Sequence, residues 1–170
     1  SRLGLSGIPV SAETIALRVA AVTWQEVVRR AGQLLVARGA VEPRYVTAMQ
    51  GMIEQHGPYV VILPGVALLH AHPGDGVKRT CMSLVTLREP GRFGHARNDP
   101  VHVAVALATM DNYAHYGALR QLIEMVRSPE ALAKVTCATT PQDICALIAR
   151  LSRNGNTPNP SGSHADLSHS

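Results

Sequence analysis

The sequence predicts a single α/β domain in which a mixed β-sheet is flanked by helices on both faces. Two observations support this fold class. Apolar segments typical of buried strands occur between segments with helical periodicity. In addition, 46% of the 170 residues are hydrophobic, which is enough apolar material for one full core. The domain is expected over residues 13–152, between a loose leader over 1–12 and a flexible tail over 153–170.

The first third of the domain is predicted to contain one strand and two helices. Alternating apolar residues indicate a strand over 14–20. The segment Thr23-Trp-Gln-Glu26 has the form of a capping box, which indicates the start of a helix that Gly39 ends. Pro43 suits the first turn of a second helix, which is expected to run to His56.

The next apolar run, residues 59–69, is interrupted only by Pro64-Gly65 and indicates a buried pair of strands. It places His70 where a strand opens into a turn. There an imidazole is held by rigid structure and remains open to a partner, as nucleophilic or proton-transfer chemistry requires. The alternative is a half-buried histidine that only hydrogen-bonds a backbone carbonyl.

A further strand followed by a helix is expected around residues 101–115. Larger apolar residues alternate with mostly small ones over 101–109, which indicates a mostly buried strand. Asp111-Asn112 are good N-cap residues, and His115 then falls in the first turn of a helix. The unpaired N–H groups of a helix N-terminus favour a phosphate or other anion. The sequence therefore predicts a site along one edge of the sheet that includes His70 and His115.

The remaining elements are a strand, a loop and three helices. The strand is expected over residues 80–87 and the loop over 91–100. The helices are expected at 113–127, 129–136 and 141–152.

Several of these segments match a known family. The matching pieces are Gly57-Pro58-Tyr59, Pro64-Gly65-Val66-Ala67, His70-Ala71, Pro73-x-x-Gly76-Val77, Asn98-Asp99-Pro100-Val101, and Asp111 with His115 four residues later. With these pieces, the run from Tyr45 to about Leu132 resembles the enzyme IIA components of the bacterial phosphoenolpyruvate-dependent sugar phosphotransferase system (PTS), of the mannitol/fructose type. Within that type it is most similar to the ascorbate-class subgroup. The resemblance covers most of residues 13–150.

The resemblance implies a cytoplasmic phosphotransferase with the mannitol/fructose-type IIA fold. In the family, the histidine matching His70 accepts a phosphoryl group from the phosphocarrier HPr. It then passes the group to a cysteine of the cognate IIB component, which serves a membrane IIC permease. The histidine matching His115 hydrogen-bonds the phosphoryl group in the active site. The expected catalytic residues are therefore His70 and His115, with no cofactor and no metal.

The chain departs from the family pattern at three positions. Leu69 stands where the family usually has proline, and Tyr116 replaces a common aliphatic residue. Glu54 occupies the position that aligns with an active-site arginine of the mannitol branch. Whether Arg79 or Arg44 substitutes for that arginine stays open.

Composition narrows the function classes. The formal net charge is +4, but the cations are scattered and the chain has one Phe and one Trp, so nucleic-acid binding is not expected. The longest apolar run is too short to cross a membrane. The three cysteines lack metal-type spacing and are expected to be small buried hydrophobes.

Three functions fit these residues. The first is a PTS phosphocarrier. The second is a IIA-like regulatory module that takes phosphate on the same His70 and signals to a partner. The third is a metal-dependent hydrolase that uses His70, His72 and His115, with His95 or Asp99 as a further ligand.

Two structural expectations follow from the phosphocarrier hypothesis. One ring nitrogen of His70 should be held by a hydrogen-bond acceptor, which would fix the tautomer. The docking partners should share one surface around His70. The candidates for that surface are the turn over residues 73–76, the loop around Asn98-Asp99, Tyr113 and Tyr116.

Overall fold

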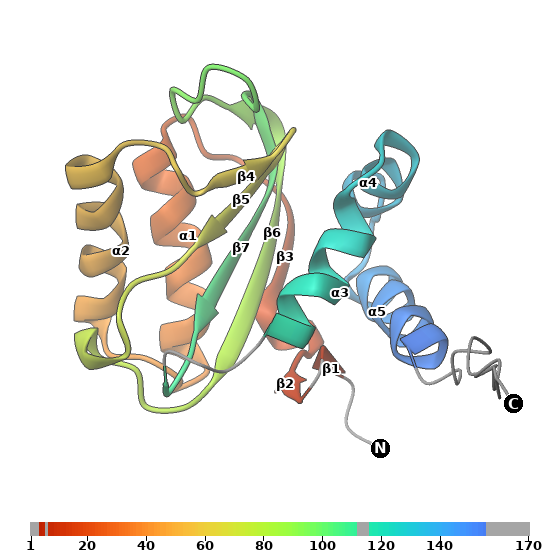
Figure 1. Cartoon of the computed structure of the whole chain (residues 1–170), viewed down its shortest axis with the longest axis horizontal. Coiled ribbons are helices and arrows are strands. Elements are labelled where there is room, and N and C mark those ends of the chain that lie inside the picture. The colour runs from red at the N-terminus through yellow and green to blue at the C-terminus, as the bar shows by residue number, and fades with distance from the viewer. Residues whose placement is uncertain (1–3, 6, 112–115, 156–170) are drawn as a thin grey trace, which may run out of the picture.

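The computed structural model describes residues 4–5, 7–111 and 116–155 (Figure 1). Its strands are β1 (Gly4–Leu5), β2 (Ile8–Pro9), β3 (Ile15–Val19), β4 (Val61–Leu63), β5 (Val66–Leu69), β6 (Cys81–Gly91) and β7 (Val101–Ala108). Its helices are α1 (Trp24–Ala37), α2 (Pro43–His56), α3 (Tyr116–Val126), α4 (Pro129–Thr136) and α5 (Pro141–Gly155), with short 3-10 turns at Ala12–Thr14 and Pro73–Asp75.

Five strands form one sheet in the order β3-β6-β7-β5-β4. β5 pairs with β7 and β3 with β6 in parallel, whereas the β6–β7 and β4–β5 pairs are antiparallel. The predicted mixed sheet is therefore confirmed. As a result, β5 and β7 stop at the same end of the sheet at which β3 and β6 begin. We call this the His70 end, because His70 follows β5, and the opposite one the Gly65 end, because Gly65 lies between β4 and β5.

Helices cover both faces of the sheet, as predicted. α1 and α2 pack on one face, and α3, α4 and α5 pack on the other (Figure 1). Neighbouring residues of β5 point to opposite sides, so Leu69 joins the apolar cluster under α1 and α2 and Leu68 joins the cluster under α3 to α5. Because both faces of the sheet are buried, an accessible site has to lie at a strand end.

The predicted limits of the first two helices are confirmed. The Thr23 hydroxyl accepts a hydrogen bond from Glu26 N at 3.2 Å, and the Glu26 carboxylate accepts one from Val22 N at 2.9 Å. α2 begins with Pro43 and stops at Gly57, whose φ of +82° favours glycine. This sharp stop sets the point at which the chain turns into β4.

Pro64 and Gly65 form the turn between β4 and β5, which confirms the predicted strand pair. The φ of Gly65 is +80°, a conformation that side chains other than glycine rarely adopt. A Cβ at this position would also lie 3.1 Å from His102 Cδ2 and 3.2 Å from the Leu132 side chain. Glycine is therefore required here, and the tight turn directs β5 toward His70.

The expectation of a loose leader is wrong for the described residues between 4 and 11. β1 and β2 pair as a small antiparallel hairpin, and β1 contacts α3 and α5. Ile8 is fully buried and Val10 is 7% exposed, both in the cluster under α3 to α5. Two isolated apolar residues form no recognisable period in the sequence, so their burial is a result of tertiary packing.

Other boundaries also differ from the expected ones. β6 continues past residue 87 to Gly91, and α5 continues past residue 152 to Gly155. The predicted start of a helix at residue 113 and the tail from residue 156 onward lie outside the described residues. Cys81 is buried as expected, but the expectation is wrong for Cys137, which is exposed because it caps the end of α4.

Candidate functional site

A cleft of about 220 Å³ opens at the His70 end between the ends of β5 and β7. His70 comes directly after β5, and Asp111 follows β7 closely. The parallel pairing of Leu69 with Ala106 brings these two segments together. The residues that line the cleft are Leu68, His70, Ala71, His72, Pro73, Leu107, Thr109 and Asp111. The prediction that the two segments meet at one edge of the sheet is thus confirmed for His70 and Asp111.

The His70 ring is held by its own strand. Its Nδ1 lies 3.2 Å from the carbonyl oxygen of Leu68. A carbonyl can only accept, so Nδ1 has to carry the proton and donate it. The expected acceptor on one ring nitrogen is thereby confirmed. The other nitrogen, Nε2, makes no hydrogen bond to the described residues and keeps its lone pair for a partner in the cleft.

Tyr45 of α2 fixes the backbone next to His70. Its hydroxyl accepts a hydrogen bond from Ala71 N at 3.0 Å and donates one to the Leu107 carbonyl at 2.6 Å. Tyr45 is fully buried, and burial raises the pKa of its hydroxyl to about 12, so the hydroxyl stays protonated and can donate. One side chain therefore ties α2, the end of β5 and the end of β7 together.

A second tyrosine contacts the His70 ring directly. The ring centroids of Tyr59 and His70 lie 6.0 Å apart with the planes perpendicular, and on its other side Tyr59 meets His56 at 6.1 Å. This edge contact is a favourable arrangement of two aromatic rings. Tyr59 is 41% exposed and Met110, beside the cleft residue Asp111, is 55% exposed. The His70 ring is therefore bordered by an aromatic group that remains accessible.

The turn after His70 is braced by polar contacts. Asp75 accepts a hydrogen bond from His72 N at 3.0 Å, and Arg44 donates one to the Gly74 carbonyl at 3.0 Å. Arg44 also pairs with Glu42 at 2.6 Å, and this hydrogen bond lowers the pKa of the Glu42 carboxyl. Arg44 thus serves the turn, and neither it nor Arg79 lines the cleft.

The loop before β7 lies at the Gly65 end, so its expected place beside His70 is wrong. Asn98 accepts a hydrogen bond from Gly65 N at 2.9 Å, and its side chain donates one to the Val61 carbonyl at 2.9 Å. Because β5 and β7 run parallel, the start of β7 has to lie beside the start of β5, whereas His70 lies beyond the far end of β5. Figure 1 shows this loop, in green, at the opposite end of the sheet from the arrowheads of β5 and β7.

The same placement weakens the hydrolase alternative. His95 accepts backbone hydrogen bonds through Nδ1, and the Asp99 carboxylate accepts others from Phe93 N and Gly94 N, all within the loop at the Gly65 end. Neither can join His70 as a metal ligand. Within the described ranges, no three His, Cys, Asp or Glu side chains are grouped to hold a metal ion.

Two predicted residues are not placed by the structure. His115 and Tyr113 lie outside the described residues, so the meeting of His115 with His70 stays a prediction. Tyr116, the first residue of α3, is 78% exposed.

Sequence reasoning missed the function of Tyr45, although a signal was present. Tyr45, Met49 and Ile53 recur at helical spacing and form the buried face of α2. A tyrosine on such a face has a hydroxyl that needs a buried partner, and the partners here are the backbone groups beside the cleft.

In the part of the chain that the structure describes, no helix has the length and apolar character needed to span a bilayer.

The family described as "Phosphoenolpyruvate-dependent sugar phosphotransferase system, EIIA 2" matches residues 9–151. The ascorbate-specific PTS system EIIA component of Escherichia coli K12 is 40% identical over 139 residues, which cover 81% of this chain and 90% of that protein. The corresponding protein of Salmonella typhimurium is 40% identical over 138 residues, with the same coverage.

Among solved structures, the chain is similar to enzyme IIA for mannitol in its complex with phosphorylated enzyme IIB from Escherichia coli. The TM-score is 0.74 at 26% identity, and the match covers 84% of this chain and 99% of that one.

Proposed function

Because the chain belongs to the EIIA 2 family of the phosphoenolpyruvate-dependent sugar phosphotransferase system, we propose that His70 is its phosphoryl acceptor and that Nε2 is the atom phosphorylated. The observation that carries this proposal is the hydrogen bond from Nδ1 to the Leu68 carbonyl. It assigns the proton to Nδ1 and leaves the Nε2 lone pair as the nucleophile of an open cleft.

In the proposed step, Nε2 attacks the phosphorus of a phosphohistidine on HPr. The new Nε2–P bond forms as the donor's N–P bond breaks, and the donor imidazole departs with the bonding electrons. His70 keeps its proton on Nδ1, so a positive charge develops on the ring. The Leu68 carbonyl oxygen, 3.2 Å from Nδ1, is placed to stabilise that charge.

The second step passes the phosphoryl group on to the IIB component. A cysteine thiolate of the IIB component attacks the phosphorus, the Nε2–P bond breaks, and a neutral imidazole is restored. Both steps depend on an in-line approach to phosphorus, so the rate of each step depends strongly on the position of Nε2. The Tyr45 hydroxyl bonds and the Tyr59 ring contact support that position.

The partners are proposed to dock around the cleft. The structurally similar mannitol IIA is seen together with phosphorylated IIB, which supports a cognate IIB partner for this chain. Tyr59 supplies an exposed aromatic group beside His70, Met110 an exposed apolar one next to the cleft residue Asp111, and Pro73 of the turn over residues 73–76 lines the cleft. Such a small, partly apolar surface suits partners that dissociate after each transfer. The membrane IIC permease is reached through IIB.

His115 is proposed to assist by hydrogen-bonding the phosphoryl group on His70. Support comes from the chain path: residue 115 follows Asp111, which lines the cleft, and precedes the first turn of α3. A helix start at this point would add backbone N–H donors to those of the histidine.

The test is phosphorylation in a reconstituted system. The protein is incubated with phosphoenolpyruvate, enzyme I and HPr, and phosphate is mapped by mass spectrometry under alkaline conditions. We expect label on His70, no label in His70→Ala, and normal label in the matched control His72→Ala, because His72 lines the cleft but makes no ring hydrogen bond to the Leu68 carbonyl. Label that persists in His70→Ala contradicts the proposal.

The partner class is a separate question, because the sugar is chosen by the permease. Relatives 40% identical to this chain are named ascorbate-specific. We therefore expect the phosphorylated protein to transfer to an ascorbate-class IIB with a kcat/KM at least about tenfold above that for a mannitol-class IIB. The opposite ranking would reassign the chain to another sugar branch and leave the role of His70 unchanged.

A further inference from the structure

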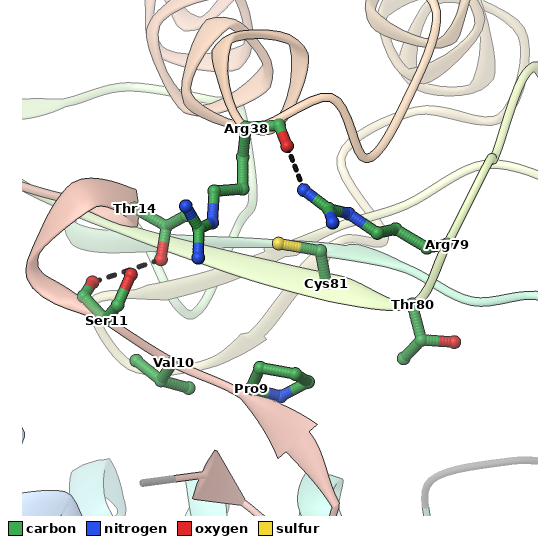
Figure 2. Close-up of a pocket in the computed structure, with 8 residues that line it drawn as sticks. All are labelled: Pro9, Val10, Ser11, Thr14, Arg38, Arg79, Thr80 and Cys81. Carbon is green, nitrogen blue, oxygen red and sulfur yellow. Dashed lines mark hydrogen bonds between the residues drawn. The ribbon is translucent and has the colours of Figure 1, made fainter. Parts of the chain in front are cut away.

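A second cavity, of about 460 Å³, also lies at the His70 end, where β3 and β6 begin. Figure 2 shows the residues that line it, which are Pro9, Val10, Ser11, Thr14, Arg38, Arg79, Thr80 and Cys81. None of them lines the His70 cleft. Cys81 pairs with Ala108, so β7 and β6 separate this cavity from His70 by about 10 Å at the usual strand spacing.

Two guanidinium groups converge on this cavity. Figure 2 shows Arg38 and Arg79 pointing into it from different elements, with the sulfur of Cys81 between them. Arg38 is the residue that caps the end of α1, and Arg79 donates one N–H to its backbone carbonyl. The other N–H groups of Arg79 have no partner among the described residues, and Arg79 makes no ion pair with them.

The carboxylate nearest to the pair does not fill the cavity. Glu13 pairs with Arg38, but it is not a lining residue, and the two side chains are 67% and 45% exposed. An ion pair this exposed is strongly screened. One positive charge in the cavity therefore stays uncompensated, and two like charges that converge repel each other unless an anion lies between them.

The remaining walls suit an anion as well. Ser11 contributes a hydroxyl group, whereas the Thr14 hydroxyl already donates its proton to the Ser11 carbonyl. The Ser11 hydroxyl has no partner among the described residues, so it is available to donate to an anion. The Thr80 hydroxyl accepts a hydrogen bond from Met110 N at 3.4 Å and is directed away from the two guanidinium groups (Figure 2). Burial raises the pKa of the Cys81 thiol, so this wall is neutral and does not repel a negative charge.

We propose that this cavity binds a small molecule through a phosphate or carboxylate group held between Arg38 and Arg79, with a hydroxyl hydrogen bond from Ser11. Arginine forks match the oxygen spacing of both groups. The volume is in the range of small-molecule sites. The proposal is independent of phosphorylation at His70, because the two cavities share no lining residue.

The test is an NMR titration of the ¹⁵N-labelled protein with inorganic phosphate and, separately, malonate, at ionic strength held constant with chloride. We expect saturable shifts in the signals of Ser11, Arg38, Arg79 and Cys81. The two probes distinguish a phosphate ligand from a carboxylate ligand by their affinities. Shifts that do not saturate, or that appear equally with chloride alone, overturn the proposal.

Two variants make the test specific. Arg79→Gln should weaken the tighter probe by about tenfold or more, since a charge-assisted fork is lost. Arg120→Gln, an exposed arginine on α3, removes the same charge elsewhere and should leave affinity unchanged. An equal loss of affinity in both variants would mean that the anion is attracted only by the net charge of the protein, and would overturn the proposed site. If Arg79→Gln fails to fold, Arg79→Lys keeps the charge without the fork and should still bind measurably more weakly.

Discussion

The two ends of the sheet both carry histidine residues, but they use them differently. At the Gly65 end, His95 and Asp99 accept hydrogen bonds from backbone N–H groups of their own loop, which commits both side chains to holding that loop. His95 therefore carries its proton on Nε2. At the His70 end, Nδ1 donates to the Leu68 carbonyl, so the lone pair of His70 is left on Nε2 beside an open cleft. The tautomer that the backbone imposes, together with an open cleft, therefore marks the functional end better than residue type does.

The largest effect is expected at His115, which we propose as a second histidine of the functional end. His115→Ala should still accept phosphate on His70, but transfer should slow by about 10²–10³-fold, the typical cost of losing one donor to a transferring group. Rapid-quench measurement of transfer from HPr checks this, with His102→Ala, on β7 at the Gly65 end, as control. Unchanged rates in the His115 variant would remove it from the site.

The Gly65 end should affect stability and leave chemistry unchanged. Asp99→Ala removes the carboxylate that accepts hydrogen bonds from Phe93 N and Gly94 N, at a cost of about 2–3 kcal/mol in the free energy of unfolding. Urea denaturation measures this cost, and phosphorylation assayed well below the midpoint should stay normal.

His70→Ala is the matched control for Asp99→Ala, with the opposite expected outcome. Its stability should stay close to that of the parent protein while phosphorylation is lost. A strong loss of phosphorylation in folded Asp99→Ala would break the contrast between the two ends.

Tyr45→Phe should show a smaller effect on both properties. It leaves Ala71 N and the Leu107 carbonyl without their partner, at a cost of about 1–3 kcal/mol, and it loosens the backbone that positions His70. The midpoint temperature of thermal unfolding and the rate of phosphoryl transfer should both decrease. A variant that loses stability at an unchanged transfer rate would show that Tyr45 does not position the histidine.

The dependence of stability on alkaline pH tests the role of the same Tyr45 hydroxyl. Burial raises the pKa of Tyr45 to about 12 in the folded protein, above the ordinary value of about 10. The stability that depends on the neutral hydroxyl is therefore complete below about pH 10 and is lost as the pH rises toward 12. The advantage of the parent protein over Tyr45→Phe should shrink by about 1.4 kcal/mol at pH 11.

The features that could be predicted from sequence depend on local patterns. The signal for the start of α1 lies within four residues, from Thr23 to Glu26. Pro64-Gly65 likewise defines a turn within a single strand pair. The position of His70 at a strand end follows from the apolar run that precedes it. In each case the interacting groups are near neighbours in the chain, so the residue order alone specifies the contact.

The features that could not be predicted depend on pairing between distant segments. The parallel pairing of β5 with β7 sends Asn98 to the end opposite His70, which no local pattern in either segment specifies. The carbonyl of Arg38 meets Arg79 from 41 positions away, and Tyr45 reaches Leu107 across 62. Such contacts arise from packing of the whole domain.

The most direct test of the account is the identity of the phosphorylated atom. NMR of the uniformly ¹⁵N-labelled, phosphorylated protein, kept at alkaline pH, distinguishes the two ring nitrogens by their couplings to phosphorus and to the ring protons. The hydrogen bond from Nδ1 to Leu68 predicts phosphate on Nε2 of His70, with the proton still on Nδ1. Phosphate on Nδ1 of His70, or on any other side chain, would contradict the central claim.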